Sequence, residues 1–210
     1  MIRVLMADDH AIVRSGLKQI LSTTTDVIVA AEAADGGAVL EQLRAGKFDL
    51  LLLDMSMPGI SGIDLIRRVQ AEWPSLAILI LSMHNEAQVA SRALRAGAWG
   101  YVTKDSEPEI LLGAIRKLAS GGKFIDPALV DAMVFYQRGT DAHSHEVLSD
   151  REFQVLQQLA AGQTVNEIAE AFSLSAKTIS TYKARLMQKL TLQNNAELVR
   201  YALKHGLTKE

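Results

Sequence analysis

The chain has 210 residues, of which 49% are apolar and 22% charged, and its net charge is −2. This length favours two domains of roughly 100 residues each. The absence of cysteine excludes disulfides and thiolate chemistry, and no apolar run approaches the roughly 20 residues that a membrane helix needs. We therefore expect a soluble cytoplasmic protein without a membrane partner.

Short apolar segments alternate with helical patterns in the first half of the chain. The apolar segments are 2–7, 27–31, 50–53, 76–81 and 101–102, and helical spacing recurs over 11–21, 38–43, 63–69, 85–96 and 106–118. Asn85 with Gln88, and Ser106 with Glu109, predict capped starts for the last two of these helices. Strands too apolar to face water, separated by helices, predict a doubly wound α/β fold. We expect a five-stranded parallel sheet in the flavodoxin-like order 2-1-3-4-5.

Polar side chains follow the carboxyl ends of four predicted strands. Asp54 ends the strand of four consecutive leucines, Asp8 and Asp9 follow the first strand, and Ser82 and Lys104 follow the fourth and fifth. A carboxylate inside the apolar layer would carry a heavy desolvation cost, so Asp54 should sit at the sheet edge. In the predicted strand order the first and third strands are neighbours, and these groups converge at the switch point between them.

The chemistry of this set favours phosphoryl transfer. Three carboxylates within a few Å repel one another unless their pKa values rise or a cation binds. Oxygen ligands without His or Cys favour Mg²⁺. A metal together with Lys104 and the Ser82 hydroxyl can neutralise a transferring phosphoryl group, with Asp54 as its acceptor. Taken singly, Asp8 or Asp9 could instead cap the following helix, and Ser82 and Lys104 could be a turn hydroxyl and a surface charge.

The polar residues of 1–119 also match a known pattern. The matching residues are Asp8-Asp9, Asp54-Met55-Ser56-Met57-Pro58-Gly59, Ser82, Tyr101 and Lys104. With these residues the segment resembles a response-regulator receiver domain. The resemblance implies that a sensor histidine kinase phosphorylates Asp54, and that Asp9, Asp54 and the Ser56 carbonyl hold Mg²⁺ while Asp8 supports the metal through water. It also implies that Ser82 and Lys104 bind the phosphoryl oxygens, and that Tyr101 swings inward when Ser82 moves.

Residues 120–146 are predicted to link the two halves. Ser120-Gly121-Gly122 breaks the last helix of the first half. Asp126 followed by Pro127 then predicts the start of a short helix over 127–136. Residues 137–145 are polar and have no periodicity, which predicts a tether.

Residues 147–210 are predicted to form four short helices. Two capping boxes, Ser149 with Glu152 and Thr164 with Glu167, start the first two, and Ser175 and Asn194 start the others. The expected bounds are 149–161, 164–171, 175–190 and 194–205. The middle pair, joined by the tight turn 172–174, fits a helix-turn-helix.

The third of these helices is basic on one side and carries no acid. Its apolar residues Ile179, Tyr182, Leu186 and Leu190 share a face and should pack on the first two helices. The opposite side suits a DNA major groove, because long bases reach phosphates and small residues approach base edges. Lys183 lies nearer the buried face and ranks below Lys177 and Arg185. The expected contacts are Lys177, Thr178, Ser180, Thr181, Ala184, Arg185 and, last, Lys183.

Three motifs of this half match a second known pattern. They are Leu148-Ser149-Asp150-Arg151-Glu152, Ile168-Ala169 and Lys177-Thr178-Ile179-Ser180-Thr181-Tyr182. Residues 148–207 thereby resemble the LuxR-type helix-turn-helix of NarL/FixJ regulators. The resemblance implies that the last helix, 196–202, pairs two subunits, so that a homodimer reads two half-sites of double-stranded DNA. We predict a DNA-binding transcriptional response regulator of a two-component phosphorelay, with RNA polymerase as a further candidate partner. It would not be an enzyme, except that it assists its own phosphorylation.

Two other functions remain open at this point. Aspartate-nucleophile phosphatases also use Mg²⁺ and an aspartyl intermediate, but they need an Asp-x-Asp stretch. Here Asp8 and Asp9 are adjacent, and Ser56 stands two residues after Asp54. Alternatively, the receiver could be an unphosphorylated dimer scaffold for a DNA-binding regulator.

Overall fold

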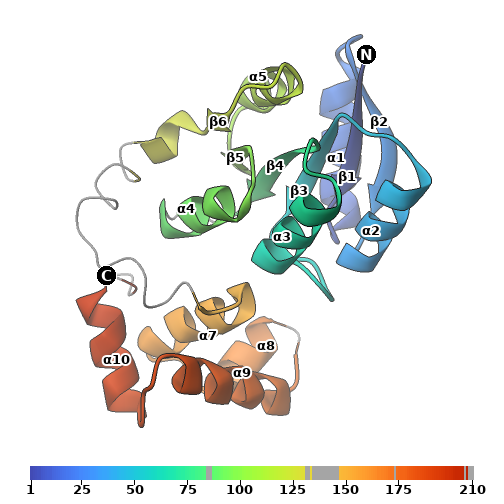
Figure 1. Cartoon of the computed structure of the whole chain (residues 1–210). Coiled ribbons are helices and arrows are strands. Elements are labelled where there is room, and N and C mark those ends of the chain that lie inside the picture. Colours follow the sequence, from blue (N-terminus) through green and yellow to red (C-terminus); the bar gives the residue numbers. More distant parts are fainter. Residues whose placement is uncertain (84–86, 131–132, 134–146, 173, 206, 208–210) are drawn as a thin grey trace. The chain divides into compact units, whose positions relative to one another are not determined.

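The chain folds into two compact units, Met1–Arg138 and Gly139–Glu210. The computed structural model describes residues 1–83, 87–130, 133, 147–172, 174–205 and 207. Within these residues, no helix combines the length and the apolar character that crossing a bilayer requires. Figure 1 labels the helices and strands of both units.

The first unit is built on a parallel sheet of six strands (Figure 1). Its elements are β1 (Ile2–Ala7), α1 (Ala11–Ser22), β2 (Val27–Ala33), α2 (Gly36–Ala45), β3 (Leu50–Asp54), α3 (Gly62–Glu72), β4 (Ala77–Ser82), α4 (Ala87–Ala96), β5 (Gly100–Thr103), α5 (Pro108–Ala119) and β6 (Phe124–Ile125). The strand order is β2-β1-β3-β4-β5-β6. The predicted order of the first five strands is confirmed, and the sheet has one strand more than predicted.

Alternate residues of the strands bury two separate apolar layers. On β1, Leu5 joins the layer covered by α2, α3 and α4, whereas Val4 and Met6 join the layer covered by α1 and α5. The four leucines of β3 divide in the same way and are at most 1% exposed. A strand buried on both faces has no room for polar residues along its length, so its polar end residues gather at the sheet edge.

The sixth strand forms where the sequence predicted the linker to begin. Gly121 takes a left-handed conformation (φ +86°), and the N–H of Gly122 donates to the Lys117 carbonyl, which turns the chain back to the sheet. Phe124 and Ile125 then pair with Gly100 and Tyr101 of β5. A Cβ at Gly100 would lie 2.9 Å from the Phe124 carbonyl oxygen. Glycine at position 100 therefore allows the close approach of β6.

Asp126 follows β6 and ties it to the loop after β5. Its side chain is buried, accepts hydrogen bonds from the backbone N–H groups of Thr103 (3.3 Å) and Ala128 (3.0 Å), and contacts the Ser106 hydroxyl. Burial acts to raise the pKa of Asp126, but these hydrogen bonds outweigh it and hold the pKa below its usual range. The predicted cap of the linker helix by Asp126 is confirmed.

The predicted start of α5 at Ser106 and Glu109 is wrong. The N-cap residue of α5 is Glu107, without a side-chain cap, and Pro108 is the first helical residue. The Ser106 hydroxyl is directed instead to Asp126, 20 positions along the chain. A capping pattern in the sequence contains only neighbouring residues. The buried, charged carboxylate of Asp126 is a stronger partner for this hydroxyl than the backbone of the first turn of α5.

The second unit consists of four helices with the predicted caps. They are α7 (Asp150–Ala160), α8 (Val165–Ala171), α9 (Ala176–Lys189) and α10 (Asn195–Lys204). Both predicted capping boxes are present, at Ser149 with Glu152 and at Thr164 with Glu167. Ser175 and Asn194 accept the capping hydrogen bonds of α9 and α10. α9 packs against both α7 and α8.

Four predictions fall wholly or partly on residues outside the described ranges. Residues 127–130 and 133 of the predicted linker helix are helical, and the rest of 127–136 is not described. The predicted cap at Asn85, the tether over 137–145 and the middle of the turn at 172–174 also lie outside those ranges.

Candidate phosphoacceptor and DNA-binding sites

The polar residues predicted to converge do meet at one end of the sheet. β1 and β3 are neighbours, and β3 pairs with β4 so that Asp54 lies opposite Leu81, directly before Ser82. On the other side of β4, Ser82 pairs with Thr103, the residue before Lys104. Asp8 and Asp54 are 1% and 3% exposed, so the two carboxylates are buried at this edge. The parallel register thus assembles the site.

Lys104 binds both buried carboxylates. Its Nζ lies 2.6 Å from Oδ2 of Asp8 and 3.3 Å from Oδ1 of Asp54, and its side chain is only 9% exposed. The backbone N–H of Lys104 donates to the Ser82 carbonyl (2.9 Å), which fixes the start of this loop on β4. One ammonium therefore compensates part of the negative charge of the site.

The environment of Asp54 changes the pKa of its carboxyl group. Burial raises the pKa of Asp54 above its ordinary value; the Lys104 ammonium opposes this change, and the Asp8 carboxylate adds to it. An ionised Asp54 is therefore unfavourable without a further cation. A divalent cation nearby would relieve this cost.

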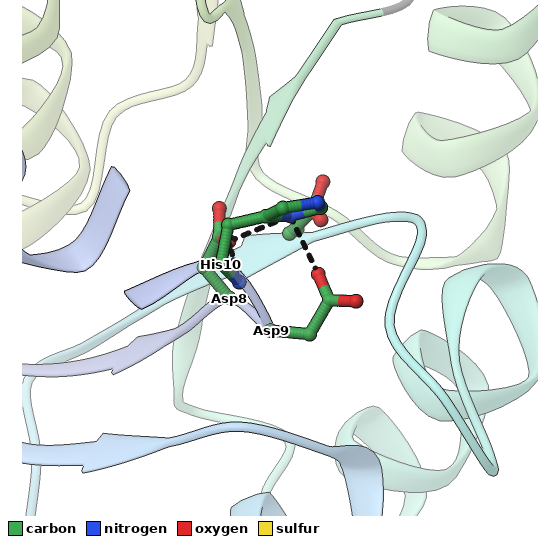
Figure 2. A group of neighbouring side chains, drawn as sticks. Asp8, Asp9 and His10 are labelled. Atoms are coloured by element: carbon green, nitrogen blue, oxygen red, sulfur yellow. Dashed lines mark hydrogen bonds and ion pairs between the residues drawn. The ribbon is translucent and has the colours of Figure 1, made fainter. Parts of the chain in front are cut away.

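A histidine that the sequence reasoning missed belongs to the same cluster. The Nδ1 atom of His10 lies 2.9 Å from Oδ1 of Asp9 and 3.5 Å from Oδ1 of Asp8. Figure 2 shows the Asp9 carboxylate turned toward the His10 ring. His10 is also the N-cap residue of α1, so the alternative in which Asp8 or Asp9 caps this helix is wrong. The available signal was its position next to the Asp pair.

The cluster fits a divalent cation. One ligand atom from each of Asp8, Asp9, His10 and Asp54 lies within 4.8 Å of every other. Carboxylates dominate this set, and hard cations such as Mg²⁺ prefer oxygen ligands. Ser56, whose carbonyl was the fourth predicted ligand, is half-buried in the loop that follows β3. The site can therefore hold a cation close to Asp54 and Lys104.

The predicted switch residues lie beside this edge. Ser82 and Tyr101 are both fully buried, and Tyr101 pairs with Ile80 on one side and Ile125 on the other. Tyr101 shares its apolar cluster with Leu129 and with Met133. The aromatic ring is thus inside the protein, packed in the same core as the first residues after β6.

The predicted DNA-binding side of α9 is exposed. Ile179 and Leu186 are fully buried and Tyr182 is half-buried, which confirms the predicted packing face. Lys183 is half-buried, as expected for a base near that face. Thr178 is also half-buried, and the exposed residues of the predicted contact set are Lys177, Ser180, Thr181, Ala184 and Arg185.

A further base of α9, Lys189, has a partner within the second unit. Nζ of Lys189 lies 2.6 Å from Oε2 of Glu152, which is 2% exposed and also accepts the backbone N–H of Ser149 (2.8 Å). Burial acts to raise the pKa of Glu152, but the hydrogen bonds from Lys189 and Ser149 hold the pKa below its usual range. The pair fastens the end of α9 to the start of α7. The capping pattern in the sequence predicts only the role of Glu152 at the start of α7.

Family models and known proteins match both units. Residues 4–116 match the model described as response regulator receiver domain, and residues 146–202 match the model of bacterial regulatory proteins, luxR family. The response regulator UvrY of Escherichia coli is 35% identical over 209 residues, which cover 99% of this chain and 96% of UvrY. The oxygen regulatory protein NreC of Staphylococcus carnosus is 37% identical over 213 residues, covering 98% of each chain.

Solved structures give the same match over almost the whole chain. RcsB from Salmonella enterica serovar Typhimurium, bound to a promoter in the presence of the phosphomimetic BeF₃⁻, is 33% identical. It covers 98% of both chains with a TM-score of 0.62. A structure of two RcsB dimers bound to two parallel DNAs has a TM-score of 0.62 and 32% identity, and covers 97% of this chain and 98% of that one.

Proposed function

The chain belongs to the two-component response regulators that join a receiver domain to a LuxR-type DNA-binding domain, and we propose that Asp54 is its phosphorylated residue. It is thus a DNA-binding transcriptional regulator of a two-component system. The observation that carries the proposal for Asp54 is the contact of one buried ammonium, Lys104 Nζ, with both Asp8 and Asp54 at the sheet edge.

The residues of this edge can divide the work of phosphoryl transfer. An Asp54 oxygen attacks the phosphorus of a phosphohistidine, a P–O bond forms, and the P–N bond to the departing imidazole breaks. Lys104 is close enough to Asp54 to bind an oxygen of the transferred group, and Ser82 lies one residue beyond the pairing partner of Asp54 on β4. Preorganised donors of this kind lower the barrier by stabilising charge on the equatorial oxygens.

Asp8, Asp9, Asp54 and the Ser56 carbonyl would hold Mg²⁺ in this regulator. The ion, when bound, would neutralise charge on the phosphoryl oxygens and draw them toward Asp54. This proposed Mg²⁺ site is supported by four ligand atoms that lie within 4.8 Å of one another, three of which come from carboxylates. Asp8 contacts Lys104 through Oδ2, which leaves Oδ1 on the side of His10.

We assign the chain no catalytic turnover beyond assistance to its own phosphorylation. Its partners would be a sensor histidine kinase, a second copy of this chain, and DNA with two half-sites. The solved RcsB structures support the last two, because they contain RcsB dimers on DNA. RNA polymerase is a further candidate. Steady release of phosphate from a phosphomonoester would instead favour the phosphatase alternative.

The test is the response of the full chain to beryllofluoride with Mg²⁺. We expect light scattering to show a shift from monomers toward dimers, and a DNA fragment selected by the chain from a random pool to bind more tightly. The reason is that a charge change at Asp54 biases the surrounding elements, including buried Ser82 and Tyr101. Unchanged assembly and unchanged DNA affinity would contradict control through Asp54 and favour the phosphorylation-independent regulator.

Replacing Lys177 should weaken DNA binding through the loss of a phosphate contact. Lys177 is exposed in the first turn of α9, and its carbonyl accepts the Thr181 hydroxyl (2.9 Å). For Lys177→Ala, we expect the slope of log affinity against log salt to become shallower by about one unit. Titrations between low and high salt measure this slope. Lys47→Ala, at an exposed lysine of the first unit, is the control, and an unchanged slope in Lys177→Ala would remove Lys177 from the phosphate contacts.

A further inference from the structure

Lys104 lies in a tight turn that follows β5. The backbone N–H of Ser106 donates to the Thr103 carbonyl (3.2 Å), which closes a four-residue turn with Lys104 and Asp105 in its middle. The stem of a lysine side chain is long and flexible. The ammonium of Lys104 is therefore placed accurately only if the turn that carries it is held in position.

One buried carboxylate binds both ends of this turn. Oδ2 of Asp126 accepts hydrogen bonds from the backbone N–H of Thr103 (3.3 Å) and from the Ser106 hydroxyl. The hydroxyl oxygens of Thr103 and Ser106 are themselves 2.7 Å apart. Asp126 and Thr103 are 1% and 5% exposed, so these hydrogen bonds are largely shielded from water. The first and last residues of the turn are thus tied to the same oxygen atom, on either side of Lys104.

Asp126 is itself fixed by the backbone on both sides of it. Its N–H donates to the Tyr101 carbonyl (2.9 Å), which continues the pairing of β6 with β5 (Figure 1). Its second carboxylate oxygen, Oδ1, accepts the backbone N–H of Ala128 (3.0 Å). Both oxygens are engaged, so the carboxylate cannot rotate away from the turn without losing the bond to Ala128. A side chain held in this way can fix the position of its neighbours.

We propose that Asp126 is a positioning residue for phosphoryl transfer, because it holds the turn over 103–106 and so keeps the Lys104 ammonium at the phosphoacceptor edge. Nζ of Lys104 lies 2.6 Å from Asp8 Oδ2 and 3.3 Å from Asp54 Oδ1. Misplacement of a group by about 1 Å in such a site can slow a reaction by up to roughly a hundredfold. The inference rests on the proposed function, since it requires Lys104 to bind the transferred phosphoryl group.

The test measures the initial rate at which the full chain takes up a phosphoryl group from acetyl phosphate with Mg²⁺, followed by intact mass. For Asp126→Asn we expect a rate roughly tenfold lower, because an amide has one acceptor oxygen and cannot serve both the turn and Ala128. Ser106→Ala leaves Asp126 and its bond to Ala128 in place, and should lower the rate roughly threefold. Ser75→Ala, at an exposed serine before β4, is the control and should keep the natural rate.

The same variants in a Lys104→Ala background separate positioning from general damage to the fold. There, Asp126→Asn and Ser106→Ala should each change the rate by less than about twofold, because the group that Asp126 positions is gone. Losses as large as in the natural chain would overturn the proposal, since general damage to the fold slows uptake in both backgrounds. If Asp126→Asn failed to fold, Ser106→Ala would still decide between these outcomes.

The measured rates also distinguish this inference from the proposed function. Natural rates in both Asp126→Asn and Ser106→Ala, together with slow uptake by Lys104→Ala, would overturn only the role of Asp126. No uptake by the natural chain, or a natural rate in Lys104→Ala, would contradict the proposed function, and this inference would fall with it.

Discussion

Asp54→Asn is expected to abolish phosphoryl uptake and, at the same time, to make the first unit more stable. The amide cannot form an acyl phosphate, so incubation with acetyl phosphate and Mg²⁺ should add no phosphoryl group to the mass of the variant. The gain in stability follows from the raised pKa of Asp54 in the folded chain, which burial causes. A carboxylate with a raised pKa is unfavourable when ionised, so its cost is present at neutral pH and relieved as pH falls through that pKa.

The stability effect should be about 1 kcal/mol, or a few degrees in melting temperature, when a chelator removes divalent cations. Both tryptophans, Trp73 and Trp99, lie in the first unit, so their fluorescence follows its unfolding. With saturating Mg²⁺ the natural chain gains binding energy, and the difference should shrink or reverse. Asp105→Asn, at an exposed carboxylate beside Lys104, is the matched control. Phosphoryl uptake by Asp54→Asn would contradict the assignment of the acceptor.

Lys189→Met is expected to destabilise the DNA-binding unit by about 1 to 3 kcal/mol. The change leaves the Glu152 carboxylate, which is 2% exposed, without the ammonium 2.6 Å away. The estimate lies below that for a fully buried pair because the Lys189 side chain is 40% exposed and water can partly replace it. Urea unfolding followed by circular dichroism reports the helices of both units, whereas tryptophan fluorescence reports the first unit.

Lys189→Met should therefore shift only one of the two unfolding transitions. The circular dichroism transition should move to lower urea, and the fluorescence transition should stay in place. Because hydrogen bonds hold the pKa of Glu152 low in the folded state, the stabilisation exists above the unfolded pKa of about 4.3. It is lost as pH falls through the folded value, so the difference between variant and natural chain should narrow in acid. Lys204→Met, in the last turn of α10, is the control. Equal shifts of the circular dichroism transition in Lys189→Met and Lys204→Met would contradict a stabilising role of the Lys189–Glu152 ion pair.

Most of the fold could be predicted from the sequence because the relevant signals were local and strong. Continuous apolar runs predicted the central strands, and the capping boxes at Ser149 and Thr164 predicted two helix starts. β6 could not be predicted, because Phe124 and Ile125 are too few to show a period and their pairing depends on Gly100. The predicted start of α5 at Ser106 failed for the opposite reason. The capping pattern was local, whereas the partner of the Ser106 hydroxyl, Asp126, is distant in the sequence.

The candidate site was predictable where residue type and strand end coincided. Asp8, Asp54 and Lys104 follow strands, and the parallel register brings them into contact. His10 escaped notice because it follows the acidic pair without a spacing pattern of its own, and only distances reveal its approach to Asp9. The partner of Lys189 could not be predicted either, since nothing in a sequence shows that a charge is already paired.

The short edge strand determines how much chain a free-standing receiver requires. Excision at residue 116, where the match to the receiver family ends, would discard β6 together with Asp126. The Ser106 hydroxyl would lose its acceptor, and the cluster around Tyr101 would lose Leu129 and Met133. A shortened protein intended to retain the native sheet should therefore extend at least through position 133.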